Sequence, residues 1–375
     1  MRIYFIAALW ILGAVGPIAA LNLTPVALRD FGSLWGAGRA IMAGIDPYHV
    51  EAFKLFGEQQ LGVGSYNFTY PPHALLLFMP FSLLPAVPAF IVWNLFSIAL
   101  FYFAARPLMP KGLPPILALL VPPVFINSNF GQTGLITAAL FLFAFRGSGL
   151  SAAALTFKPH MGFLVLLALL RDRRALAIAV GASLLLTLAS ALLFGGWSDF
   201  FLHARDYQAR TLFNHTQDVW VVQATTPMIG YGVWGWLLYA IGAIYLLSRN
   251  FGVFTAATAT FLISPYGLHY DMAAVCLGFS ILLFTNWDAM PMWHRAIATL
   301  AYLTPVIVGF GTWLVPPILL IGLLVQCQWL EGVRLKVDVG KPGHRRLRFE
   351  TEPRPIPSGT TTNRPGDRAA VPESR

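Results

Sequence analysis

The chain has 375 residues, of which 57% are hydrophobic and only 11% are charged. Soluble domains carry about 25% charged residues, so this composition excludes an ordinary water-soluble fold and predicts an all-α polytopic membrane protein. The net charge of +9 could suit nucleic acid, but the cations gather in short loops and in the C-terminal tail, as in cytoplasmic loops of membrane proteins. We therefore expect membrane lipids around the chain and no nucleic-acid partner.

The apolar runs predict about twelve transmembrane helices over residues 1–330. A span needs about 20 apolar residues, and the first run, 3–23, has no clear cleavage site, so we expect a retained span rather than a signal peptide. The other expected spans are 73–84, 88–105, 113–126, 133–145, 150–170, 175–194, 228–247, 251–266, 270–285, 296–310 and 312–330. This count puts both termini inside the cell and two larger loops, 24–70 and 195–227, outside it.

Polar stretches separate and follow these spans. The first loop, 24–70, contains a possible amphipathic interfacial helix from Phe31 to Met42, with Trp35 at headgroup depth and Gly44 as its stop. The second loop, 195–227, suits a helix from Ser198 to about Thr211. The segment 331–375 is basic, rich in proline and threonine and without periodicity, which predicts a largely disordered cytoplasmic tail.

The segment 106–132 predicts an interrupted region of the bundle. Pro114, Pro115, Pro122 and Pro123 break a short apolar run that ends in a polar stretch at Gln132. Broken helices persist at membrane depth only when they are buried in protein or line a wet cavity, so we expect a cavity wall. The amides of this stretch, Asn127, Asn129 and Gln132, could bind sugar hydroxyls or could bond helix to helix.

Asp30 is the first candidate for chemistry, because it directly follows the first predicted membrane exit. Ionisable groups in or beside the membrane are functional candidates by default. The alternative is an N-cap of the helix that follows, paired with Arg29 or Arg39. Asp46 and Tyr48 lie one short helix further on.

Lys158 is the second candidate, because it lies inside an apolar run. A buried lysine must lose its charge, pair, or bind an anion, and a phosphate suits a compact ammonium. The alternative is an internal ion pair with Asp30, Asp46 or Asp271.

The segment 264–271 is the third candidate, a polar and aromatic cluster between two spans. His269 and Tyr270 could bind a phosphate or a sugar hydroxyl, or the cluster could be an ordinary turn in an aromatic belt. The chain has no phosphate-binding loop, nucleophile elbow or zinc-spaced cysteine pair. We expect no cofactor and no metal site.

The order of these segments resembles the membrane glycosyltransferases of the GT-C fold, and among them family 87, the polyprenyl-phosphate-mannose-dependent mannosyltransferases. The resemblance covers about residues 1–330. It is carried by Asp30, Gly44 to Tyr48, Phe68 to Pro72, Gly131 and Gln132, Lys158 and Pro159, and Ser264 to Tyr266 with Tyr270 and Asp271.

The resemblance implies a GT-C-like bundle in a bacterial inner membrane. It implies transfer of a sugar from a polyprenyl-phosphate donor to a lipid or glycan acceptor at the outer face, without metal and with inversion, and Asp30 as general base. We expect Lys158 and His269 near the donor phosphate. The expected sugar or acceptor ligands are Asp46, Tyr48, Tyr70, Gln132, Tyr270 and Asp271. The alternatives are a transporter or flippase of a lipid-linked sugar and a non-catalytic assembly subunit.

Overall fold

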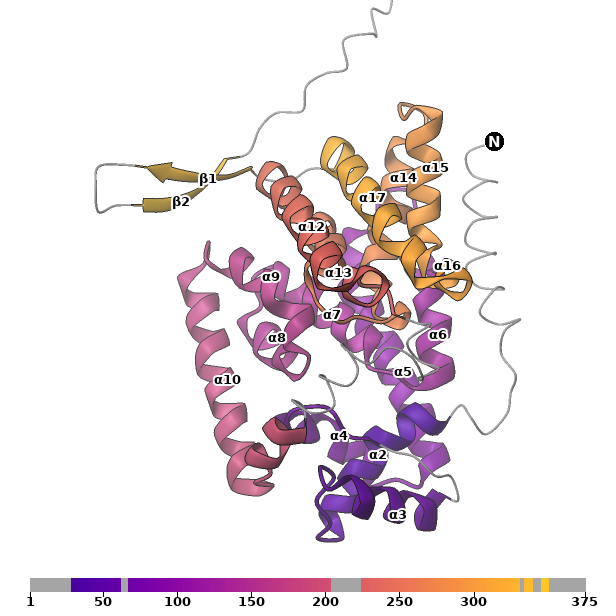
Figure 1. Ribbon diagram of the computed structural model, residues 1–375, viewed down its shortest axis with the longest axis vertical. Helices are drawn as coiled ribbons and strands as arrows, with labels where there is room; N and C mark the ends of the chain where they lie inside the picture. The colour runs from indigo at the N-terminus through magenta and orange to yellow at the C-terminus, as the bar shows by residue number, and fades with distance from the viewer. Residues whose placement is uncertain (1–27, 62–66, 204–223, 331–333, 340–344, 351–375) are drawn as a thin grey trace, which may run out of the picture.

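The computed structural model describes residues 28–61, 67–203, 224–330, 334–339 and 345–350. The predicted first span, 3–23, lies outside these residues, as does most of the second predicted loop. The described chain is helical, with its first half, α2 to α10, forming the lower part and one side of the molecule and its second half, α12 to α17, the upper part (Figure 1).

The bounds of the elements are as follows. The helices are α2 (Leu28–Met42), α3 (Val50–Leu61), α4 (Leu75–Ser82), α5 (Ala86–Ala105), α6 (Pro122–Phe130), α7 (Gly134–Phe145), α8 (Gly149–Ala154), α9 (Pro159–Leu169), α10 (Arg173–Leu193), α12 (Pro227–Arg249), α13 (Val253–Ile263), α14 (Ala273–Asn286), α15 (Met292–Tyr302), α16 (Thr304–Ile307) and α17 (Val315–Trp329). Short 3-10 helices include η2 (Pro72–Ala74), η4 (Pro115–Leu120), η5 (Leu155–Phe157), η7 (His269–Asp271) and η9 (Thr312–Leu314).

Within the described residues, four helices are long and apolar enough to cross a membrane. They are Ala86–Leu108, Arg173–Leu193, Pro227–Arg249 and Thr312–Trp329. Five shorter apolar helices accompany them, among them α13 and α14, whose side chains are almost all buried. Helices enclosed by protein need not match the bilayer thickness, so the structure combines long lipid-facing helices with short buried ones.

The helix α10 illustrates how the sequence sets a boundary. Asp172 caps its N-terminus, since its Oδ1 accepts hydrogen bonds from the amides of Arg174 (2.9 Å) and Ala175 (3.1 Å). Leu184, Leu185 and other leucines along the helix are exposed, as expected for a lipid-facing span. The basic turn before α10 lies toward the opposite end of the molecule from α2 and α3 (Figure 1).

The first predicted loop is folded more tightly than the sequence suggested. The indole N–H of Trp35 donates to the carbonyl of Leu84 (3.0 Å), and the Ser82 hydroxyl donates to the carbonyl of Trp35 (2.8 Å). Trp35 is therefore buried against α4 and bonded within the protein, while its depth at the lipid headgroups stays a prediction. A further helix that was not predicted, α3, packs beside α2.

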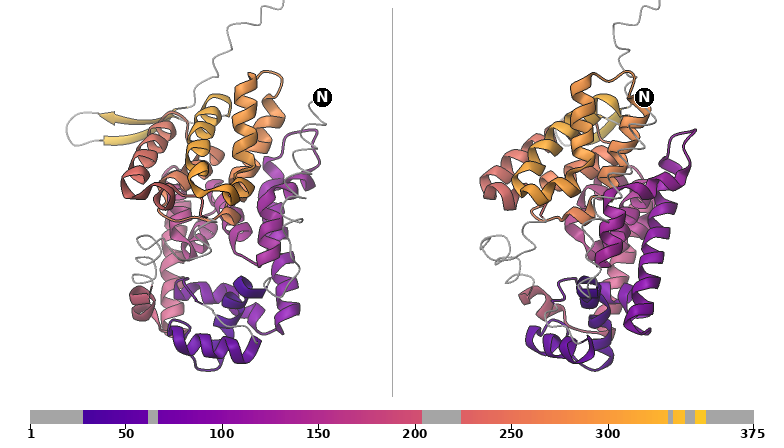
Figure 2. Two further views of the ribbon diagram at one scale, coloured as in Figure 1. Left: turned by 45° about the vertical axis from the view of Figure 1, so that its right-hand side comes forward. Right: turned by 90° about the vertical axis from the view of Figure 1, so that its right-hand side faces the viewer.

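The start of the second predicted loop folds back onto the first. Gly195 and Gly196 have φ of +63° and +71°, a backbone conformation that favours glycine, and they reverse the chain after α10. The Trp197 ring then stacks on His73 with centroids 5.8 Å apart, and Phe200 packs edge-on against Tyr48, also at 5.8 Å. The two loops thus meet at one end of the molecule (Figure 2).

In the described part of the chain, several predicted spans are interrupted: 296–310 is divided into α15, α16 and a short 3-10 helix, and two further breaks lie near the candidate site. The break around η4 and α6 was predicted from its prolines. The expected span 150–170 is also broken, into α8, η5 and α9, so the prediction of one continuous helix there is wrong. The cause is Pro159, which disfavours helical backbone at the preceding residue, and Lys158 accordingly has φ −136° and ψ 66°.

The predicted tail contains some regular structure. Strands β1 (Arg334–Val339) and β2 (Arg345–Glu350) pair antiparallel, with Leu335 opposite Phe349. Polar and apolar residues alternate through much of both segments, which is the period of a strand and which amino-acid composition alone does not reveal. The remainder of 331–375 lies outside the described residues.

The approach of α7 to η7 gives a first prediction. A Cβ at Gly134 would collide with the Tyr270 carbonyl, so Gly134→Ala should cost about 1 to 3 kcal/mol by overpacking. We expect a lower melting temperature for the detergent-purified variant by scanning fluorimetry. Gly181→Ala is the control, because nothing lies within 4 Å of that Cβ. Equal melting of the two variants would contradict the contact.

Candidate active site

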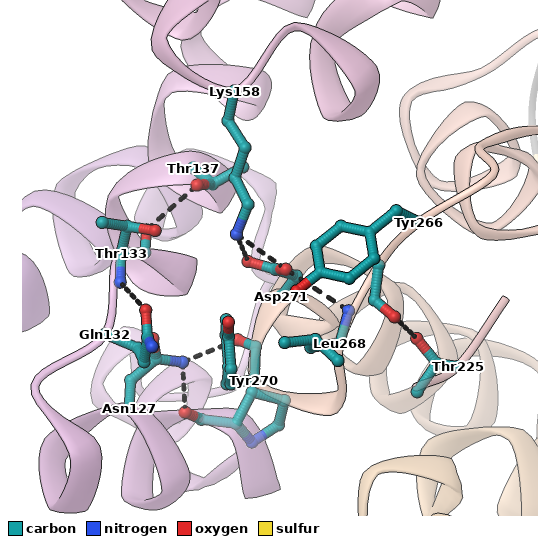
Figure 3. Close-up of polar contacts among 12 residues, drawn as sticks. Asn127, Gln132, Thr133, Thr137, Lys158, Thr225, Tyr266, Leu268, Tyr270 and Asp271 are labelled. Atoms are coloured by element: carbon teal, nitrogen blue, oxygen red, sulfur yellow. Dashed lines mark hydrogen bonds and ion pairs between the residues drawn. The ribbon is translucent and has the colours of Figure 1, made fainter. Parts of the chain in front are cut away.

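A buried ion pair lies at the centre of the candidate site. The Lys158 ammonium donates to both carboxylate oxygens of Asp271, at 2.6 and 2.8 Å, and both side chains are almost completely buried. Lys158 comes from the break between η5 and α9, and Asp271 from η7, so the pair joins two distant segments (Figure 3). The ammonium also lies 5.2 Å from the ring centroid of Tyr270. Of the two alternatives for Lys158, binding of an anion or an internal ion pair, the structure contains the internal pair.

The segment that carries Asp271 is held from several sides. The side-chain amide of Asn127 donates to the backbone carbonyl of Tyr270 at 2.6 Å and to that of Pro123 at 2.7 Å. The end of the second loop pairs with this segment through the Thr225 amide and the Gly267 carbonyl (3.0 Å). Asn127, considered above as a sugar ligand, thus serves as a link between α6 and η7 (Figure 3).

A chain of hydrogen bonds connects the first loop to the same cluster. Asp46 accepts from the Tyr48 amide (2.9 Å), and the Tyr48 hydroxyl donates to the Tyr70 carbonyl (2.6 Å). The Tyr70 hydroxyl lies 3.0 Å from the Thr133 hydroxyl at the start of α7. Burial raises the pKa of the Tyr48 phenol, and the charge of Asp46 adds to this effect. The phenol therefore stays protonated and can donate.

Asp30 acts on the cluster through its charge, as its effect on Tyr70 indicates. Burial is the main cause that raises the pKa of Tyr70. The charge of Lys158 and the bond to Thr133 lower it, and the carboxylates of Asp271 and Asp30 raise it. Three ionisable side chains from α2, the α9 break and η7 thus act on one phenol.

Asp30 itself differs from the sequence expectation in its position. It lies in the first turn of α2 and not before the helix, so its role as an N-cap is wrong. Pairing with Arg39 is also excluded, because nine residues of helix separate them by about 13.5 Å. The Arg39 guanidinium instead lies 5.2 Å from the ring of Trp35. Asp30 is partly buried and acts electrostatically on Tyr270 as well as Tyr70.

The remaining predicted residues divide between the cluster and its periphery. His269 is buried and packs against Tyr270, with ring centroids 5.6 Å apart. Gln132 is half-buried beside Thr133, whose backbone amide donates to the side-chain Oε1 of Gln132 (3.4 Å). Asp46 and Tyr48 reach the cluster only through Tyr70. Thr133 was not singled out from the sequence, and its place at the start of α7, next to Gln132, was the one available signal.

Fold and site together define a class of protein. The chain is a helical membrane protein in which acidic, basic and phenolic side chains come together beside broken helices and the first predicted loop, an arrangement suited to a substrate that is itself bound to the membrane. A family model of glycosyltransferase family 87 matches residues 68–285, and the chain belongs to this family. No curated protein and no solved structure matches the chain. Family membership indicates a glycosyltransferase, in preference to the transporter and the non-catalytic subunit left open above.

The ion pair gives a second prediction. Lys158→Met leaves a buried carboxylate without its cation, and removing one member of a buried pair costs about 3 to 5 kcal/mol. We expect a marked fall in melting temperature for Lys158→Met and a substantial recovery in the double variant Lys158→Met with Asp271→Leu. Lys54→Met, at an exposed position of α3, should melt like the parent protein. An uncoupled double-mutant cycle would contradict the pairing.

Proposed function

We propose that the protein transfers a hexose, with mannose as the first candidate, from a polyprenyl-phosphate donor to a lipid or glycan acceptor. The reaction takes place at the extracytoplasmic face of a bacterial inner membrane, within a bundle of about twelve crossings. The observation that carries this proposal is that separate segments bring Tyr70 of the first predicted loop close to the buried Lys158–Asp271 pair, while the charge of the partly buried Asp30 acts on Tyr70.

Asp30 is the general base in this proposal. The acceptor hydroxyl gives its proton to the Asp30 carboxylate while its oxygen attacks the anomeric carbon, and the bond from that carbon to the donor phosphate breaks with its electron pair. A positioned base is typically worth about 10² to 10⁴ in rate. The partial burial of Asp30 and the effect of its charge on two phenols support this role.

The balance of charge supports the same step. In the reaction Asp30 loses its negative charge as it takes the proton, and the leaving phosphate gains one. The total charge of the cluster therefore stays constant while negative charge moves away from α2. Negative charge already develops on the leaving phosphate in the transition state. A cation fixed close to the phosphate therefore stabilises the transition state more than the bound substrate, which is the requirement for electrostatic catalysis. Lys158, with His269 close by, is the proposed cation.

The proposed orientation rests on the distribution of basic residues. The basic turn before α10 lies away from the end of the molecule that α2, α3 and the start of the second predicted loop form (Figure 1). Basic turns favour the cytoplasmic side, so the end formed by α2, α3 and the start of the second loop is the extracytoplasmic one.

Replacing Asp30 tests the base assignment. Asp30→Asn keeps the size of the side chain and removes the proton acceptor, so transfer from a radiolabelled polyprenyl-phosphate mannose should fall by at least about 10²-fold with donor binding near normal. Glu58→Gln is the control, because Glu58 is an exposed carboxylate on α3 of the same loop. Turnover in Asp30→Asn comparable to that of the control would refute the assignment.

The donor role of Lys158 needs a variant that still folds. In the double variant Lys158→Met with Asp271→Leu, the buried charges are removed together, so a loss of stability does not obscure the kinetics. We expect the apparent KM for the polyprenyl-phosphate sugar to rise by about tenfold or more, since a hydrogen bond to a charged group contributes about 1.5 to 3 kcal/mol. An unchanged KM for the donor would show that the phosphate is bound elsewhere.

A further inference from the structure

A second polar site lies where the two loops meet, apart from the ion pair. A cavity of about 280 Å³ opens between the turn that follows α2 and the turn that follows α10. Its walls include Ile41, Ile45, Asp46, Leu193, Phe194 and Asp199. One wall therefore comes from each predicted extracytoplasmic loop or its border, so the cavity exists only because the loops pack together.

The shape of this cavity is set by packing at its edges. Gly196 has φ +71°, and a Cβ there would lie 3.3 Å from the Tyr48 ring, so the turn can approach Tyr48 closely only with glycine. Gly44, with φ +75°, ends α2 on the other side. The edge-on contact of Tyr48 with Phe200 closes the junction. These contacts give the cavity fixed walls before any ligand arrives.

The size of the cavity favours a small organic ligand over an ion. At about 30 Å³ per water molecule, it holds about nine waters, and it approaches the lower limit of about 300 Å³ for ligand pockets. A divalent cation prefers six or more oxygen ligands, whereas this cavity offers two carboxylates, and one oxygen of Asp46 already accepts from the Tyr48 amide. An anion would be repelled by both carboxylates.

The chemistry of the walls fits a sugar ring. A hexose presents hydroxyl donors around its rim and C–H groups on its faces. Asp46 and Asp199 supply acceptors for the hydroxyls, and Ile41, Ile45 and Phe194 supply apolar surface for a ring face. A purely apolar lipid chain would instead desolvate both carboxylates without giving them a donor.

We propose that this cavity is a subsite for one sugar residue of the acceptor, an inference that rests on the proposed glycosyltransfer and specifies its acceptor as a glycoside. Asp46 is bonded through Tyr48 to Tyr70, and Tyr70 contacts Thr133 at the cluster. A sugar held by Asp46 is thereby coupled to the loop segment that carries Tyr70 to the reacting centre. Asp199, an exposed residue of the cavity wall, contributes to the choice of acceptor.

Binding to the full-length protein in detergent tests the subsite directly. Saturation-transfer NMR with methyl α-D-mannoside and methyl β-D-glucoside measures the affinity of the parent protein, of Asp199→Asn and of a variant that fills the cavity, Ile41→Trp. Asp199 is exposed, so Asp199→Asn should fold normally, and it should weaken binding by about tenfold, as expected for a lost charge-assisted hydrogen bond. Glu58→Gln is the matched control and should bind like the parent.

Kinetics separate this proposal from the proposed function. With polyprenyl-phosphate mannose as donor and octyl α-D-mannoside as acceptor, Asp199→Asn should raise the KM for the acceptor about tenfold and leave the KM for the donor unchanged. Asp199-dependent sugar binding without any transfer would support the subsite and count against the proposed function. Sugar binding that is unaffected in both Asp199→Asn and Ile41→Trp would overturn the subsite. Binding of Mn²⁺ that is lost in Asp199→Asn, with sugar binding unchanged, would also overturn it and indicate a cation site.

Discussion

The ion pair of Lys158 and Asp271 is the interaction on which the described architecture depends most. Two charges removed from water cost several kcal/mol each, and they persist only with close geometry and further hydrogen bonds. Here both carboxylate oxygens accept from the ammonium, and the Leu268 amide approaches one of them at 3.5 Å. Because one partner comes from a proline-broken helix and the other from η7, the pair fixes two irregular segments that have few regular hydrogen bonds of their own.

The surroundings of the pair follow from the same constraint. Irregular backbone at membrane depth must find its partners within the protein, and here side-chain groups provide them: the Asn127 amide holds the Tyr270 carbonyl, and the Tyr48 hydroxyl holds the Tyr70 carbonyl. Helix association within a bilayer relies on close packing and polar contacts more than on the hydrophobic effect, and Gly134 gives the closeness that α7 and η7 need. Lys158, the cation of the proposed mechanism, is therefore also one of the groups that hold the irregular segments together.

Several features could be predicted from the sequence because they depend on local chemistry. The proline pairs predicted the break near α6, the apolar run predicted α10, and the small-rich stretch after Asp30 predicted a helix that ends before Gly44. Other features could not be predicted in this way. Trp35 is a residue type that is common at membrane interfaces, and it is buried here only because α4 packs against it. The helix α3 packs beside α2 and buries Phe53, a contact that the sequence of the first predicted loop did not indicate.

The sequence by itself determined that the chain is a helical membrane protein, which residues could bear charge inside it, and which family it resembles, because composition, apolar length and proline act within a few residues of one another. Only the tertiary structure decided which of these residues meet. It paired Lys158 with Asp271 and not with Asp30 or Asp46, and it placed Tyr48 beside the turn at Gly196. Pairing between distant segments depends on how helices cross and loops fold back, and neither is encoded in any short stretch of residues.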